Sequence, residues 1–239
     1  MPFCNGWAGR AGGVGPRGGA RTLPSMLPRR QIPNALTVLR LVLAAGFFLT
    51  LNFFRFEAPG FAGDGWLLGL ALVLFVAAAL TDWADGYLAR RWGVVSVFGR
   101  IIDPFADKIL VLGAVVYLAS PRFLDSSAVE AGHVATMVSG VYPWMVVVVL
   151  ARELLVTSIR GVAERSGTDF SAKRLGKWKM VLQSVVVPVV LLVVAIDPTL
   201  PGRAWLGWVR DTLVYLTVAV TVASGLPYVL GARTLAAGR

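Results

Sequence analysis

The chain has 239 residues, of which 56% are hydrophobic and 15% charged. Soluble domains contain about 45 to 50% apolar and about 25% charged residues, so this composition excludes a disordered chain and argues against an ordinary soluble domain. One cysteine, Cys4, and one histidine, His133, are too few for an internal disulfide or a zinc site. Any bound metal is therefore expected to be a hard cation held by oxygen atoms.

The net charge of +10 could indicate a nucleic-acid partner. The basic residues, however, do not form a basic face with interleaved aromatic side chains. They flank apolar blocks, as the topology of a membrane protein requires. We therefore expect no nucleic-acid partner.

Residues 1–31 are rich in Gly, Arg and Pro and contain neither an acidic residue nor an apolar run of signal-peptide length. This composition predicts a disordered basic tail. The remaining chain divides into a six-helix transmembrane catalytic domain at 32–234 and a short tail at 235–239.

A helix that crosses the hydrocarbon core needs about 20 mostly apolar residues. Six segments meet this condition, at roughly 35–54, 66–88, 101–120, 139–161, 177–196 and 209–231. The fold class is therefore predicted to be all-α, a polytopic membrane protein with six transmembrane helices.

The Lys and Arg residues test this topology, because cytoplasmic loops hold the excess of positive charge. With six spans, 19 of the 23 Lys and Arg residues fall on the side of the termini. The other four are Arg55, Arg122, Arg203 and Arg210. This asymmetry predicts that both termini are cytoplasmic.

Four aspartates interrupt the apolar pattern: Asp82 and Asp85 end the second span, and Asp103 and Asp107 open the third. An ionised group at membrane depth costs at least a few kcal/mol, so these residues are functional candidates. Spacings of three and four place both carboxylates of each helix on one face. The alternative is a plain helix end, in which Asp82 and Asp85 pair with Arg90 or Arg91.

The connector at 91–100 is short enough to pair the two helices as an antiparallel hairpin. The four carboxylates then meet at the cytoplasmic edge of the bilayer, where cations must offset their mutual repulsion. Oxygen ligands and four negative charges match two Mg²⁺ ions, with Mn²⁺ as an alternative.

The stretch from 82 to 107 reads D-x-x-D-G-x-x-A-R, eight residues, then G-x-x-x-D-x-x-x-D. This pattern resembles that of the CDP-alcohol phosphatidyltransferase family. The resemblance implies a six-helix membrane fold, a homodimer, two metal ions bound by the four aspartates, and Asp107 as the general base. It also assigns residues to the CDP-lipid: Gly86, Arg90, Ser96 and Gly99, with Asn34 and Thr37 as weaker companions that could instead be helix caps.

Three further segments, IPNALTVLR from Ile32, RELLVTSIR from Arg152 and LGKWKMVLQ from Leu175, are similar to bacterial phosphatidylglycerophosphate synthases, although Met180 replaces a usual Thr. This similarity implies an enzyme of the cell (inner) membrane with its active site at the cytoplasmic face. Such an enzyme transfers the phosphatidyl group of CDP-diacylglycerol to glycerol 3-phosphate and releases CMP.

A phosphate-bearing acceptor needs fixed cations, and the fourth and fifth spans offer Arg152, Arg160, Lys177 and Lys179. The lysines could equally bind lipid head groups and set the topology. Arg152 could simply pair with Glu153, but sequence neighbours point about 100° apart on a helix, so that pair is not assured.

Other functions stay open at this point. Relatives with the same pattern use serine, inositol phosphate or another phosphatidyl lipid as the acceptor. A magnesium transporter would place its acids along a path between both faces, whereas these four share one edge. A membrane prenyltransferase would show two widely separated Asp motifs.

Overall fold

The computed structural model describes residues 31–56, 65–92, 97–132, 136–165, 174–196 and 204–237. Within these ranges the chain is helical, apart from loops and one antiparallel bridge between Leu124 and Met137. The long helices are α1 (Gln31–Phe53), α2 (Gly65–Trp92), α3 (Val97–Leu118), α5 (Pro143–Arg165), α6 (Arg174–Ala195) and α7 (Ala204–Ala237). Each of the six predicted segments thus coincides largely with one long helix, and the all-α prediction is confirmed for the described residues.

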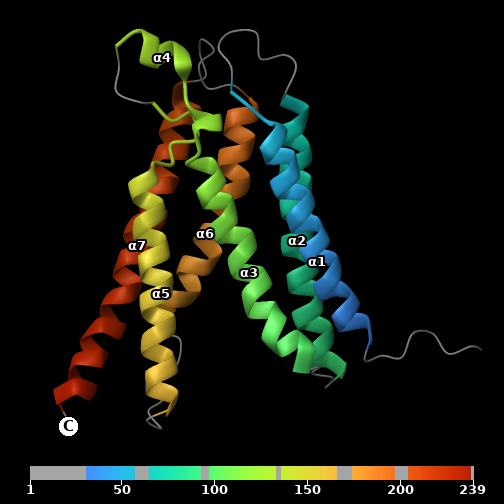
Figure 1. The fold of residues 1–239 in the computed structure, drawn as a ribbon, viewed down its shortest axis with the longest axis vertical. Coiled ribbons are helices and arrows are strands. Elements are labelled where there is room, and N and C mark those ends of the chain that lie inside the picture. The colour runs from blue at the N-terminus through green and yellow to red at the C-terminus, as the bar shows by residue number, and fades with distance from the viewer. Residues whose placement is uncertain are drawn as a thin grey trace, which may run out of the picture.

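The long helices alternate in direction along the bundle (Figure 1). α1 packs against α2 and α3, while α5 packs against α7. α6 joins these two groups, because it contacts α2, α3 and α7. As a result one end of the bundle contains the end of α2, the starts of α1, α3 and α6, and the end of α7 (Figure 1). We call this the near end and the opposite end the far end.

Aromatic side chains fill the contact between α1 and its neighbours. The ring centroid of Phe47 lies 5.2 Å from that of Phe48 and 5.5 Å from that of Phe75 on α2. Phe48 in turn lies against Gly113 of α3, where a Cβ atom would collide with the ring. Gly113 therefore allows α1 and α3 to approach each other closely.

Large apolar side chains also point outward, among them Val42, Val73, Val147 and Leu230, each about 60% exposed. Four helical segments are long and apolar enough to cross a membrane: Ala35–Phe53, Gly65–Ala84, Trp178–Ala195 and Trp205–Ala232. The chain is therefore a multi-pass membrane protein. These segments belong to four of the six predicted spans.

The other two predicted spans, α3 and α5, contain too many charged residues to count as continuous apolar segments of membrane-spanning length. In α3 only Lys108–Leu118 is continuously apolar. In α5 the apolar pattern is broken by Arg152, Glu153 and Arg160. Charged residues of this kind are tolerated in a membrane protein when they face its interior.

At the far end, residues 119–132 and 136–142 form a cap with the 3₁₀-helix η1 (Pro121–Phe123) and α4 (Ser126–Glu130). Arg122 donates to Asn52 Oδ1 at 2.9 Å and to the Phe54 carbonyl at 3.2 Å, which ties the cap to α1. Arg210 of α7 donates to the Val138 carbonyl and pairs with Asp211 at 2.8 Å. The cap thus joins α1 and α7 at this end.

The fourth span was predicted to begin at residue 139, but α5 begins at Pro143. The hydroxyl of Ser139 donates to the Leu118 carbonyl at 2.6 Å, and Gly140 has a φ of +68°. A left-handed residue interrupts a helix, whereas a proline fits its first turn. The apolar character of this segment therefore extends beyond the helix itself.

Candidate active site

The predicted aspartates lie on two helices that meet at the near end. α2 continues without a break through Asp82 and Asp85, and α3 does so through Asp103 and Asp107. The two helices contact each other, and Figure 1 shows the end of α2 beside the start of α3. The helical spacing that places each pair on one face is therefore present.

Among the predicted metal and CDP-lipid residues, the structure describes the side chains of Asp82 and Thr37 and the exposure of Gly86. The others lie outside the described side chains, so their roles stay predictions: Asn34, Asp85, Arg90, Ser96, Gly99, Asp103 and Asp107.

Asp82 has a partner that the sequence analysis did not single out. Arg40 Nη1 lies 2.8 Å from Asp82 Oδ1, and the arginine is 1% exposed while the aspartate side chain is 49% exposed. Thr37, one turn before Arg40, is also buried. Arg40 was detectable, because an arginine within an apolar span is costly unless it serves a purpose.

A cavity of about 170 Å³ lies between α3, α5 and α6. Its lining includes four cationic side chains and one acidic side chain, which gives the lining a net charge of +3. The cations are Lys108, Arg152, Arg160 and Lys179, and the acid is Glu153. Three of the four residues predicted to bind the acceptor phosphate are thus brought together, whereas the side chain of Lys177 lies outside the described part.

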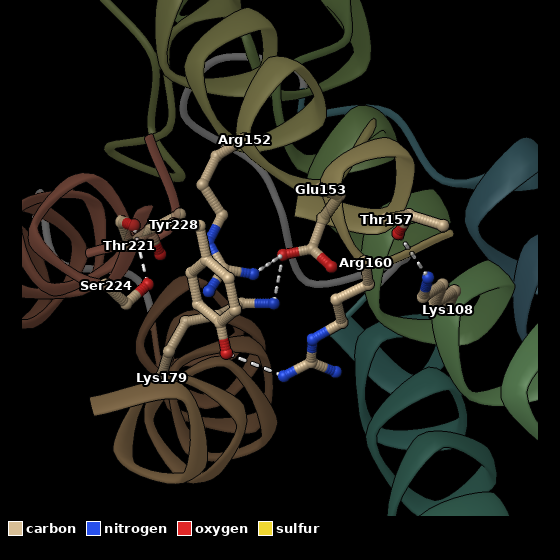
Figure 2. A network of polar contacts seen from close by, with 9 residues as sticks. All are labelled: Lys108, Arg152, Glu153, Thr157, Arg160, Lys179, Thr221, Ser224 and Tyr228. Atoms are coloured by element: carbon tan, nitrogen blue, oxygen red, sulfur yellow. Dashed lines mark hydrogen bonds and ion pairs between the residues drawn. The ribbon is translucent and has the colours of Figure 1, made fainter. Parts of the chain in front are cut away.

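Glu153 holds two of these cations in place (Figure 2). Its Oε1 atom accepts a hydrogen bond from Arg152 Nη1 at 2.9 Å and another from Lys179 Nζ. All three side chains are about nine-tenths buried. The pair between Arg152 and Glu153, left open by the sequence, is therefore real and extends to α6.

Arg160 lies about two turns beyond Arg152 on α5, toward the near end. Its Nη2 atom donates to the hydroxyl of Tyr228 on α7 at 2.6 Å (Figure 2). The Nε atoms of both Arg152 and Arg160 are buried and find no hydrogen-bond partner among the described residues. Buried donors without acceptors favour a ligand that supplies oxygen atoms, above all an anionic one.

Lys108 connects the cavity to the aspartates. It follows Asp107 directly on α3, lines the cavity and donates to Thr157 Oγ1 at 3.0 Å. The sequence analysis missed it, although a charged residue beside a candidate base was a usable signal. The cationic cavity and the predicted general base are therefore neighbours on one helix.

Beyond the cavity, toward the far end, the interior becomes apolar. A void of only about 30 Å³ is lined by Leu118, Met145, Val187 and Val190, all of them buried. Gln183 borders both this void and the cationic cavity. Among the described residues, the charged side chains of the cavity therefore lie on the near-end side of an apolar layer.

These features define a class of protein: a multi-pass helical membrane protein with a cationic cavity between its helices that suits an anionic ligand. Residues 30–223 match the family model described as CDP-alcohol phosphatidyltransferase, and the chain belongs to this family. It is accordingly a transferase of phospholipid biosynthesis.

Individual relatives narrow the comparison. The chain is 35% identical over 165 residues to CDP-diacylglycerol--glycerol-3-phosphate 3-phosphatidyltransferase of Cereibacter sphaeroides, a match that covers 68% of this chain and 63% of that protein. The enzyme of the same name from Bacillus subtilis is 31% identical over 205 residues, which cover 83% and 93% of the two chains. Cardiolipin synthase (CMP-forming) of Oryza sativa is 28% identical over 82% of this chain and 56% of its own length.

Proposed function

We propose that the chain transfers the phosphatidyl group of CDP-diacylglycerol to glycerol 3-phosphate, giving phosphatidylglycerol phosphate and CMP. The observation that carries this proposal is the cavity in which Arg152, Arg160 and Lys179 meet beside the helix of Asp107. A cluster of fixed cations can form charge-assisted hydrogen bonds to the phosphate of an acceptor, whereas a neutral acceptor has no group that would use them. The names of the relatives from Cereibacter and Bacillus agree with this choice of substrates.

In the proposed reaction the 1-hydroxyl of glycerol 3-phosphate attacks the β-phosphorus of CDP-diacylglycerol. Asp107 takes the proton of that hydroxyl, a phosphorus–oxygen bond forms, and the bond from the same phosphorus to the oxygen of the departing CMP breaks. The cations of the cavity bind the acceptor phosphate and so hold the hydroxyl in position. Lys108 follows Asp107 in the sequence and lines the cavity, which supports a proton acceptor close to the bound phosphate.

We expect two Mg²⁺ ions, or Mn²⁺, to be held by Asp82, Asp85, Asp103 and Asp107. The donor set suits them, because carboxylate oxygens are the ligands that these ions prefer, and the Asp82 side chain is half-exposed and so accessible to an ion. When bound, such ions orient a diphosphate and stabilise negative charge on its leaving group. Arg40 would hold Asp82 through its Oδ1 atom, which leaves the other oxygen for a metal ion.

For the CDP-lipid, the predicted contacts are Asn34, Thr37, Gly86, Arg90, Ser96 and Gly99. An open apolar groove on α3 adds a place for acyl chains. It is lined by Phe105, Ile109, Leu112, Val116 and Tyr117, and its lining also includes Lys108. A lipid in this groove would keep its chains in the membrane while its head group lies near the aspartates.

The same proposal includes the topology and the assembly. We expect α3 and α5 to span the membrane with the other four helices, both termini and the active site to be cytoplasmic, and the protein to reside in the inner membrane as a homodimer. The excess of Lys and Arg at the near end supports this orientation.

The test is an acceptor panel with purified protein and CDP-diacylglycerol, in which CMP release is measured. The panel contains glycerol 3-phosphate, glycerol, serine, inositol phosphate and phosphatidylglycerol, and the Asp107→Asn variant is the blank. We expect release with glycerol 3-phosphate and little with glycerol or serine. Preference for phosphatidylglycerol would favour the cardiolipin synthase reaction instead, and preference for serine would refute the proposal.

A further inference from the structure

α7 lies behind the cationic cavity without lining it. Two of its residues nevertheless contact the arginines that do: Tyr228 contacts Arg160, and Gly225 lies against Arg152. A spacing of three places both residues on one face of the helix. Both also lie beyond residues 30–223, the part of the chain that matches the family model.

Tyr228 holds Arg160 in two ways. Its hydroxyl accepts a hydrogen bond from Arg160 Nη2 at 2.6 Å, and its ring centroid lies 5.2 Å from the guanidinium carbon. The tyrosine is 2% exposed, so it is fixed by its surroundings. The hydroxyl also lies 4.0 Å from the position of a Cβ on Gly176 of α6, a residue of the cavity lining. Tyr228 therefore reaches from α7 to the edge of the cavity.

Arg160 needs such a support because it is long and only partly buried. A free arginine side chain can turn its charged end toward water, and ordering it on ligand binding costs entropy. A guanidinium that is already oriented avoids this cost. Tyr228 supplies the orientation through a neutral hydroxyl, which adds no charge that would compete with an anionic ligand.

Gly225 acts on the other arginine by leaving space. A Cβ built at Gly225 would lie 3.3 Å from Arg152 Cγ, which is closer than an ordinary contact. A side chain here would require Arg152, which is bonded to Glu153, to give way by a few tenths of an ångström. The same face of α7 thus accommodates Arg152 and directs Arg160.

We propose that Tyr228 is a positioning residue that orients Arg160 toward the phosphate of the acceptor, with Gly225 providing the space for Arg152. This inference rests on the proposed function, since it assigns the cavity to a phosphate-bearing acceptor. It makes α7 a determinant of acceptor affinity rather than only a membrane span.

The test is a double-mutant cycle of Tyr228→Phe with Arg160→Ala. Tyr228→Phe removes only the hydroxyl, and we expect KM for glycerol 3-phosphate to rise roughly three- to tenfold, as the loss of one hydrogen bond predicts. KM for CDP-diacylglycerol and kcat should stay within about twofold. In the Arg160→Ala background the second substitution should change nothing further. The matched control is Tyr215→Phe, because Tyr215 lies on the same helix but is half-exposed.

A full second effect in the Arg160→Ala background would overturn the inference, and so would a fall in kcat alone. If Tyr228→Phe does not fold, Gly225→Ala provides the test: KM for glycerol 3-phosphate should rise while KM for CDP-diacylglycerol does not, and an unchanged KM for glycerol 3-phosphate would overturn the inference. Calorimetry of glycerol 3-phosphate binding, without the lipid substrate, distinguishes a failure of the proposed transfer reaction from a failure of the positioning role of Tyr228. If the wild type binds it through Arg160 and Tyr228 but releases no CMP, the proposed function fails and the inference stands.

Discussion

Replacing Glu153 with glutamine should make the ligand-free protein less stable. The same substitution should increase the additional stability that the protein gains when it binds an anionic acceptor. Glu153 Oε1 accepts hydrogen bonds from both Arg152 and Lys179, in a place where all three side chains are about nine-tenths buried. Glutamine keeps the shape and the acceptor oxygen but removes the negative charge. The net charge of the cavity lining therefore rises from +3 to +4.

The size of the effect follows from those two hydrogen bonds. A hydrogen bond to a charged group contributes about 1.5 to 3 kcal/mol, which is roughly twice the contribution of a neutral one. If each of the two bonds loses half of its contribution when the acceptor becomes neutral, the total loss of stability is about 1.5 to 3 kcal/mol. For a chain of this size, 1 kcal/mol shifts the midpoint of thermal unfolding by about 2 to 4 °C. We therefore expect the midpoint of Glu153→Gln to fall by roughly 3 to 12 °C.

The assay is thermal unfolding in detergent, followed by the fluorescence of the eight tryptophans, with and without glycerol 3-phosphate. Because a ligand that binds the folded state stabilises it, the anion should raise the midpoint more in Glu153→Gln than in the wild type. Glycerol serves as the uncharged ligand, and Glu130→Gln, at an exposed glutamate of the far end, serves as the control variant. An equal ligand-induced shift in the wild type and Glu153→Gln would refute the idea that Glu153 balances the charge of an anion site.

Three further predictions concern the chemistry and the topology. Asp107→Asn should abolish CMP release but retain binding of CDP-diacylglycerol, since asparagine cannot take a proton; near-normal turnover would remove Asp107 as the base. Arg160→Ala should raise KM for glycerol 3-phosphate by about one to two orders of magnitude, as loss of a charge-assisted contact predicts, and an equal rise for CDP-diacylglycerol would mark Arg160 as structural. A reporter fused after Arg239 should be cytoplasmic and His133→Cys should be labelled from the outside; labelling of that cysteine from the cytoplasm alone would contradict the six-span topology.

Apolar blocks and charge were sufficient to predict the helices, because a membrane helix is defined by the composition of its own segment. Their ends were less predictable. α7 extends from Ala204 to Ala237, beyond the predicted 209–231. At its far end the charges of Arg210 and Asp211 compensate each other, and Arg210 also donates to the Val138 carbonyl. Such compensation depends on contacts between segments, which a hydropathy pattern does not contain.

The candidate site was predictable where one helix carries the pattern and less so where several helices combine. Arg152, Arg160 and Lys179 were found because their charge is unusual within an apolar segment, and the structure brings them to one cavity. Tyr228 was not, because a tyrosine in an apolar helix is ordinary until its hydroxyl is seen beside Arg160. Its role is a property of the packing of α5 against α7.

The apolar layer around Leu118, Met145, Val187 and Val190 has a consequence for the cell that contains this protein. A cavity with a net positive lining would be an obvious route for leakage of anions if it continued through the bundle. Here a void of only about 30 Å³, lined mostly by apolar side chains together with Gln183 and Thr217, lies between the cavity and the far end, and an ion entering it would lose its hydration and gain few polar partners. Under the proposed function, the cavity would receive a charged, water-soluble acceptor while the described interior on its far-end side stays largely apolar.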